Sequence, residues 1–134
     1  MASTDEVAKE LYGKVNGCLA VAVIDLHSGM LMGIHHEVPH FTQAYLDAVA
    51  AAAVDMFRGH TVRRMEELLS AACGREIKDS FEEIFISSPH VYHFMVIIKD
   101  KAAAVIMVTR KATNQGLGWA ILRSNLKPIA ASLS

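Results

Sequence analysis

Hydrophobic and polar positions change their spacing several times along the chain, and each change marks a different element. Near the start, apolar residues recur every four positions from Val7 to Val15. Ser3 and Glu6 have the spacing of a helix-capping box. This pattern predicts a short amphipathic helix, which Gly13 and the Asn-Gly pair that follows it would end.

The next two apolar segments predict a β-hairpin. Residues 19–24 are an uninterrupted apolar run rich in β-branched side chains, too short for a helix and typical of a strand covered on both faces. Residues 25–29 follow as the turn, in which Gly29 can adopt the positive φ of a short hairpin loop. Residues 30–36 then return as the second strand.

The segment from Gln43 to Phe57 predicts a helix with unusually little polar surface, and Thr42 can cap its start. One stripe holds its polar side chains, which are Gln43, Asp47, Asp55 and Arg58. Alanines fill positions 50–53. One side of this helix can lie on a sheet, but the remainder needs a second cover, and alanines allow two helices to approach closely.

Gly59 interrupts this apolar pattern, which resumes at Val62 and continues to Ala72 before Gly74. A single helix over residues 42–73 would be roughly 48 Å long at 1.5 Å per residue, which is large for so small a domain. One helix with a weak point at Gly59 and two separate helices both fit the pattern, and the length favours a bend.

Three further strands and a helix complete the chain. We expect the strands over residues 81–87, 91–98 and 102–109. The second and third are apolar on both alternating faces, which predicts central positions in the sheet. A final helix begins near Asn114, with apolar residues at steps of three and four. The order α-β-β-α-β-β-β-α predicts an α/β/α (α+β) domain, in which a five-stranded, mostly antiparallel sheet has helices on both faces.

Two local sequences resemble the Roadblock/dynein-light-chain family. Residues 15–25 have the sequence Val-Asn-Gly-Cys-Leu-Ala-Val-Ala-Val-Ile-Asp, and Gly-Met-Leu follows at 29–31. This is similar to the family's Gly-x-x-Ala-apolar-Asp…Gly opening hairpin, with a loop that is a little longer than usual. Residues 114–117, Asn-Gln-Gly-Leu, are similar to the Asn-x-Gly-apolar start of the family's last helix. The element order also matches, over about residues 3–132.

The resemblance implies one profilin-like domain over residues 1–134 that acts as a non-catalytic, dimeric regulatory or scaffolding module. Bacterial members of the family are often partners of small Ras-like GTPases, and other members are subunits of larger assemblies. The family's long second helix and third strand usually form the dimer seam, which here would be residues 43–57 and 81–87. The interface residues that we predict are Tyr45, Ala48, Val49, Ala52, Met56, Ile84, Phe85 and Ile86. We therefore expect a homodimer, with a small GTPase or a multisubunit complex as its partner.

Composition narrows the classes of partner. Thirteen basic and fourteen acidic residues give a formal charge of −1, which provides no electrostatic reason to expect nucleic acid. The acidic N-terminus does not have the pattern of a signal peptide, and no window reaches the roughly 18 apolar residues that a membrane span needs. We expect a cytoplasmic protein without a membrane partner.

The seven histidines do not form a recognised metal-binding pattern. His35 and His36 would point to opposite faces of a strand, and His90 and His93 likewise differ in parity. We also expect these two pairs at opposite sides of the sheet. We therefore do not expect the pair His90 and His93 to share one metal site with His35, His36 and the nearby His40. We expect no metal and no cofactor.

The remaining candidates for chemistry are weak. The two cysteines, Cys18 and Cys73, allow one disulfide, but free buried thiols are the expectation for a reducing compartment. Ser28 lies in a hairpin turn, and Gly116-x-Gly118 lacks the other parts of a nucleotide-binding fingerprint. We expect no catalytic residue.

The main alternative is a small-ligand sensor domain of the PAS or GAF type, which also surrounds an antiparallel sheet with helices. Its cavity would have to lie between the sheet and a helix, and the alanine-rich helix argues against a roomy one. A small hydrolase or metal enzyme built on the histidines is a third possibility, and the absence of a ligand set at a recognised spacing places it last.

Overall fold

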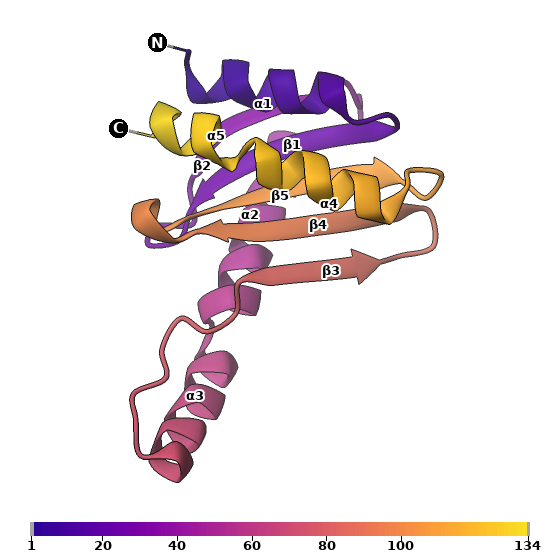
Figure 1. The fold of residues 1–134 in the computed structure, drawn as a ribbon. Helices are drawn as coiled ribbons and strands as arrows, with labels where there is room; N and C mark the ends of the chain where they lie inside the picture. Colours follow the sequence, from indigo (N-terminus) through magenta and orange to yellow (C-terminus); the bar gives the residue numbers. More distant parts are fainter. Residues whose placement is uncertain (1, 134) are drawn as a thin grey trace.

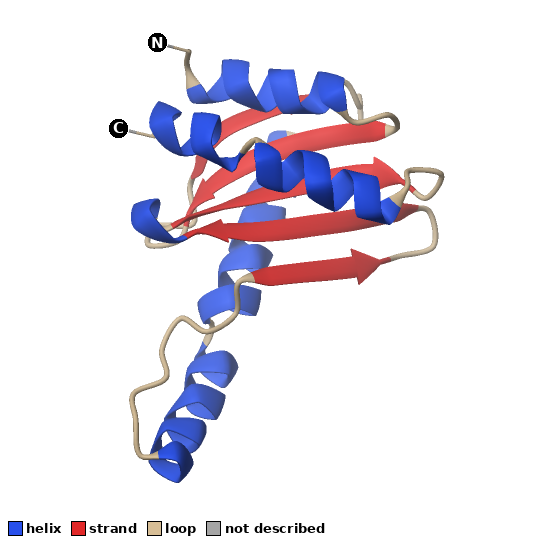
Figure 2. Cartoon of the chain, in the orientation of Figure 1, coloured by secondary structure: helices blue, strands red, loops and turns tan. Residues whose placement is uncertain are grey.

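The computed structural model describes residues 2–133, which form one antiparallel sheet with helices on both of its faces (Figures 1 and 2). The strand order is β2-β1-β5-β4-β3. The elements are α1 (Thr4–Lys14), β1 (Cys18–Asp25), β2 (Leu31–His36), α2 (Gln43–Arg58), α3 (His60–Cys73), β3 (Glu83–Ser87), β4 (Val91–Ile98), a 3-10 turn (Lys99–Lys101), β5 (Ala103–Arg110), α4 (Gln115–Ser124) and α5 (Leu126–Ser132).

The predicted α/β/α architecture and its strand order along the chain are confirmed, and all four strand pairs are antiparallel. The sequence left open whether residues 42–73 form one helix or two. The segment 42–73 is two helices, α2 and α3, which separate at Gly59. The single final helix that was predicted is wrong, because α4 and α5 meet at Asn125.

Side-chain caps fix where three helices begin. Ser3 and Glu6 form the predicted capping box, in which the Glu6 N–H donates to the Ser3 hydroxyl at 3.1 Å. Thr42 caps α2, and Asn114 caps α4 by accepting from the Leu117 N–H at 2.9 Å. Gly29 has the predicted positive φ of 73° in the β1–β2 turn.

The sheet separates two apolar cores. On one face, α1, α4 and α5 bury residues such as Leu11, Leu122 and Ile129 against Val21 and Met107 of the central strands. The other face is covered by α2, which contributes four buried side chains, Leu46, Ala50, Ala53 and Phe57. No helix among residues 2–133 is long and apolar enough to cross a lipid bilayer.

The helix α3 projects past β3, away from the sheet (Figure 1). It begins where Gly59, whose N–H donates to the Asp55 carbonyl at 2.9 Å, ends α2 in extended backbone. A Cβ at this position would collide with that same carbonyl, so glycine is required. Within α3 only Glu66 is buried, and its carboxylate accepts hydrogen bonds from the Ser80 N–H and hydroxyl at 2.7 and 2.6 Å. These bonds hold the returning loop against the helix.

Candidate interaction surface

The strand β3 forms one edge of the sheet and pairs only with β4. The Ile97 N–H donates to the Glu82 carbonyl and the Ser88 N–H to that of Val91, both at 3.0 Å. Hydrogen-bonded pairs alternate along an antiparallel ladder, so the backbone groups of residues 84 and 86 also face β4. The N–H and carbonyl groups of residues 83, 85 and 87 therefore face outward, where no described segment pairs with them.

The opposite edge, β2, is partly covered by α1. The Asp5 carboxylate accepts from the Ile34 N–H at 2.9 Å. The backbone of Thr4 lies so close to Gly33 that a Cβ there would come within 2.9 Å of it. Natural sheets commonly protect an edge in this way, because unpaired backbone groups attract other strands. The edge of β3 has no such cover in residues 2–133.

The structure divides the predicted β3 interface residues between two faces of the sheet. Ile84 and Ile86 pack with the α2 core, whereas Phe85 packs on the other face, 5.1 Å from the rings of Tyr92 and Phe94. All three predicted residues are half-buried. Alternation along the strand thus places the Phe85 side chain on the face opposite to Ile84 and Ile86.

The predicted interface residues of α2 lie largely outside the protomer core. Ala48 and Ala52 are exposed and Tyr45 is 41% exposed, while Val49 and Met56 are half-buried. Ala44 and Ala51 are also exposed. The sheet therefore covers only one side of this alanine-rich helix, as its composition suggested.

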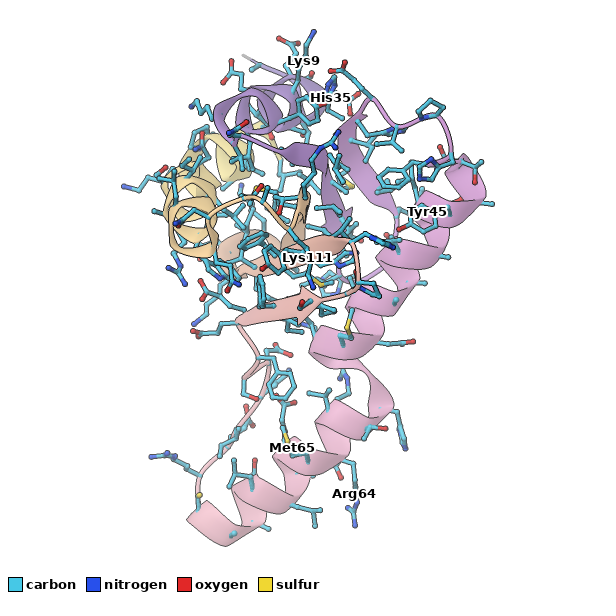
Figure 3. All side chains as sticks on the ribbon, turned by 90° about the vertical axis from the view of Figure 1, so that its right-hand side faces the viewer. Lys9, His35, Tyr45, Arg64, Met65 and Lys111 are labelled. Carbon is cyan, nitrogen blue, oxygen red and sulfur yellow. The ribbon has the colours of Figure 1, made fainter. Side chains whose placement is uncertain are left out.

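A further apolar surface lies on α3, which sequence periodicity marked as apolar but not as uncovered. Met65, Leu68 and Leu69 are 41%, 57% and 45% exposed and border a shallow hollow that Arg64 and Ala72 also line. Figure 3 shows Arg64 and Met65 on this helix, clear of the sheet. We refer to Met65, Leu68, Leu69 and Ala72 as the α3 apolar surface. It follows that helices α2 and α3 expose apolar side chains along most of their length.

Charged contacts hold the elements around this surface. Arg123 of α4 donates two hydrogen bonds of 2.7 Å to Glu83 at the start of β3, and these bonds lower the pKa of Glu83. Arg58, at the end of α2, has its Nε 3.5 Å from the Asp79 carboxylate in the returning loop. Both contacts position backbone segments, although the buried Arg58 Nε has no hydrogen-bond partner among residues 2–133.

Both cysteines are free thiols in the structure, and only one of them is buried. Burial raises the pKa of Cys18 to about 12, which makes its thiol unreactive. Cys73 is exposed at the end of α3, contrary to the expectation that both are buried, because that helix projects from the domain.

The histidines are arranged partly as predicted. His35 contacts the Glu37 carboxylate at 3.2 Å, and the His36 Nδ1 accepts from the Val38 N–H. No group of three or more His, Cys, Asp or Glu residues in the described range could hold a metal ion. The expected separation of the two histidine sets is wrong in one respect, because His40 and His93 line the same cavity.

Solved structures similar to this chain were found, but no similar sequence among protein families or curated proteins. No family model matches the sequence, and no curated protein matches it. A Roadblock/LC7 domain from Streptomyces avermitilis is similar with a TM-score of 0.72 and 11% identity, over 98% of each chain. The gliding protein MglB from Thermus thermophilus is similar with a TM-score of 0.68 and 14% identity, over 99% of this chain and 93% of that one.

A third similar structure is MglB with a tetrameric arrangement, with a TM-score of 0.70 and 14% identity, over 97% of this chain and 87% of that one. These likenesses extend over nearly the whole chain and agree with the element order predicted from the sequence. The fold of this chain is the Roadblock/LC7 fold.

Proposed function

We propose that this protein is a non-catalytic, homodimeric regulatory or scaffolding module, and that two copies join through their β3 edges. The observation that carries the proposal is one uncovered sheet edge beside a helix whose apolar side the protomer does not cover. The Roadblock resemblance supports the same seam, and one structure similar to this chain is an MglB with a tetrameric arrangement.

The backbone suggests how the two edges would pair. An antiparallel pair centred on Phe85 would use the outward-facing groups of residues 83, 85 and 87 in both copies. Glu83 would then lie opposite Ser87 of the second copy, which avoids the repulsion of two facing carboxylates. Because α3 extends past β3, it would lie over the second copy's sheet, where its apolar surface would be covered (Figure 1).

A proline in β3 tests this pairing. The Ser87 N–H faces outward, so Ser87→Pro removes a donor to the second copy and none to β4. Two such donors are lost per dimer, at about 1 kcal/mol each, so the dimer should weaken about tenfold or more. Sedimentation equilibrium should show the parent and the Ser87→Ala control at twice the chain mass of 14.6 kDa. A parent that sediments as a 14.6 kDa monomer at low micromolar concentration would contradict the proposal.

The α2 side of the seam is tested by Ala52→Arg. If Ala52 is covered by the second copy, the variant buries an unpaired charge and should break the dimer or lower its solubility. Ala131→Arg places the same charge on an exposed position of α5, on the other face of the sheet, and should remain dimeric. Equal dimerisation of both variants would show that Ala52 lies outside the seam.

We propose a small Ras-like GTPase as the partner, because bacterial proteins of the family that this sequence resembles often bind one. The doubled sheet would present a composite surface that favours one conformation of the GTPase. Such a partner would place the protein in the cytoplasm. Binding of purified Ras-like GTPases, loaded in turn with GDP and a GTP analogue, tests this assignment, and the absence of nucleotide-dependent binding would favour a plain scaffolding role.

A further inference from the structure

A cavity of about 500 Å³ lies at the N-terminal end of α2, beside the part of the sheet that this helix covers. Ala50 and Ala53, in the middle of the helix, are buried in the core that it forms with the sheet. The loop of residues 37–41 lines the cavity, which is partly open to solvent. A ligand-sized space between sheet and helix, of the kind that a sensor domain needs, therefore exists in this protein. It lies at the start of α2, before Ala50 and Ala53.

The interior of the cavity suits an apolar, planar group. Its floor is apolar, with Leu19, Val91 and Val108 contributed by three adjacent strands. Its wall contains the rings of Phe41 and Tyr45, which stack with centroids 5.0 Å apart and planes 27° apart. Cavities of several hundred Å³ with such a lining bind drug-sized molecules, and aromatic walls favour aromatic ligands.

A single unpaired cation lies at the rim. Arg110 has no carboxylate within 4 Å among the described residues, and the other charged rim residue, Glu37, already contacts His35. In the sheet register, Arg110 pairs with Val91, and His93 pairs with Val108. Arg110 and His93 are therefore diagonal neighbours on the same face of the sheet, and residues in such positions are about 7–8 Å apart. A guanidinium at the edge of an apolar cavity can bind a carboxylate with two parallel hydrogen bonds.

The second ionisable group that we consider in the cavity, His93, favours a ligand with one negative charge. The His93 Nδ1 is shielded from solvent and has no hydrogen-bond partner in residues 2–133. Burial lowers the pKa of His93, so its imidazole is neutral at pH 7 and adds no second positive charge. A phosphate dianion would therefore be matched by Arg110 at the rim but not by a second positive charge on His93.

We infer that this cavity binds a small aromatic monocarboxylate, with its ring between the apolar floor and the Phe41–Tyr45 pair and its carboxylate on Arg110. The site lies within one protomer, so the inference does not depend on the proposed dimer or its partner. The site meets the predicted α2 interface at Tyr45, whereas the α3 apolar surface carries no part of it.

Titration with 2-naphthoate, followed by ¹H–¹⁵N spectra of the full chain, tests the site. We expect saturable shifts at residues 37–41, 91–93 and 108–110. The uncharged 2-naphthylmethanol and the ringless acetate should each bind at least about tenfold more weakly, because one lacks the charge and the other lacks the ring. Equal binding of naphthoate and the alcohol, or shifts centred on the α3 apolar surface, would overturn the inference.

Two neighbouring charges give a matched pair of variants. Arg110→Gln should lower naphthoate affinity to that of the alcohol, and Arg110→Lys should restore part of it. Lys111→Gln removes the same charge one residue later, where the ammonium lies 5.7 Å from the ring of Tyr92, a residue of the other face, and should bind as the parent does. The backbone N–H of residue 110, which donates to the Gly17 carbonyl, is kept in every variant. If Arg110→Gln keeps an intact amide spectrum and binds naphthoate as tightly as the parent, Arg110 does not bind the carboxylate and the inference is wrong.

Discussion

Two glycines near α1 have very different surroundings, although both belong to regular elements. A Cβ on Gly33 of β2 would come within 2.9 Å of the Thr4 backbone, so the absence of a side chain allows α1 to lie directly on the edge strand. A Cβ on Gly13, in the last turn of α1, would have nothing within 4 Å. The close approach of α1 therefore depends on one glycine and not on the other.

Alanine at the two positions should change the free energy of unfolding in opposite directions. Gly33→Ala should lower it by about 1–3 kcal/mol, because a packed backbone would have to move. Gly13→Ala should leave it unchanged or raise it by up to about 1 kcal/mol, because alanine favours the helix. Urea unfolding measures both. A Gly33→Ala variant as stable as the parent would show that α1 and β2 are not in such close contact.

At the scale of elements, the attachment of α3 depends on Glu66. Burial opposes ionisation of this carboxyl, but the two hydrogen bonds from Ser80, together with the charge of Arg63 and the Asp79 backbone, lower the pKa of Glu66. A folded-state pKa below the unfolded one contributes stability that is present above the unfolded value and lost as pH falls through the folded value. The contact between α3 and its loop should therefore weaken in acid.

Hydrogen exchange of residues 60–80 measures this contact. Glu66→Ala should speed exchange there at neutral pH and leave the central strands β1 and β5 unchanged, because Ser80 loses its acceptor. The control Glu67→Ala removes an exposed carboxylate that reaches only Arg64, and should exchange as the parent does. The difference between parent and Glu66→Ala should vanish as pH falls well below the ordinary Glu value of 4.5. A difference that persists in acid would assign the effect to packing and not to charge.

Periodicity predicted most elements because each pattern reports on the residues of one segment. The strand over 91–98 was predicted with the bounds that it has in the structure. The break between α4 and α5 was not, because it depends on buried Asn125, which donates to the Ile121 carbonyl and accepts from Lys14 of a distant helix. Pro128 was the available signal, since it lies in the first turn of α5, where no N–H is needed.

The candidate sites also differ in whether they depend on one segment of the chain or on several distant ones. The uncovered side of α2, with Ala48 and Ala52, was predictable because it is a property of one helix. The cavity was not, because it forms only where residues 37–41 fold towards strands that come 50 or more positions later. The alternation of side chains along a strand correctly predicted that His35 and His36 point to opposite faces of the sheet. It carries no information on His40, which lies in the loop beyond the strand.

At the scale of the whole molecule, the projecting α3 carries two neighbouring arginines, Arg63 and Arg64, and neither has the setting of an inserted catalytic finger. The Arg63 Nε donates to the Arg58 carbonyl at 2.9 Å, and Arg64 is exposed beside Glu67. If the protein accelerates GTP hydrolysis, the effect should come from reshaping the GTPase's own switch segments.

Arg63→Ala and Arg64→Ala should accordingly lower partner affinity only modestly and keep stimulated turnover at saturating protein. Single-turnover GTP hydrolysis, measured across a titration of each variant, separates affinity from rate. A loss on the order of a thousandfold in stimulated rate with binding intact would identify an arginine finger, since residues of that kind have effects of about this size.

The central position of β5 has a consequence for how the chain is made. The hairpin of β1 and β2 is complete by residue 36, yet the other neighbour of β1 in the sheet is β5, which ends at Arg110. A nascent chain therefore carries an apolar strand with one unpaired edge while roughly 70 further residues are synthesised, several seconds of elongation at typical rates. Pairing of such distant segments also slows refolding. The same hairpin that begins the domain is thus the segment that chaperones would shield longest.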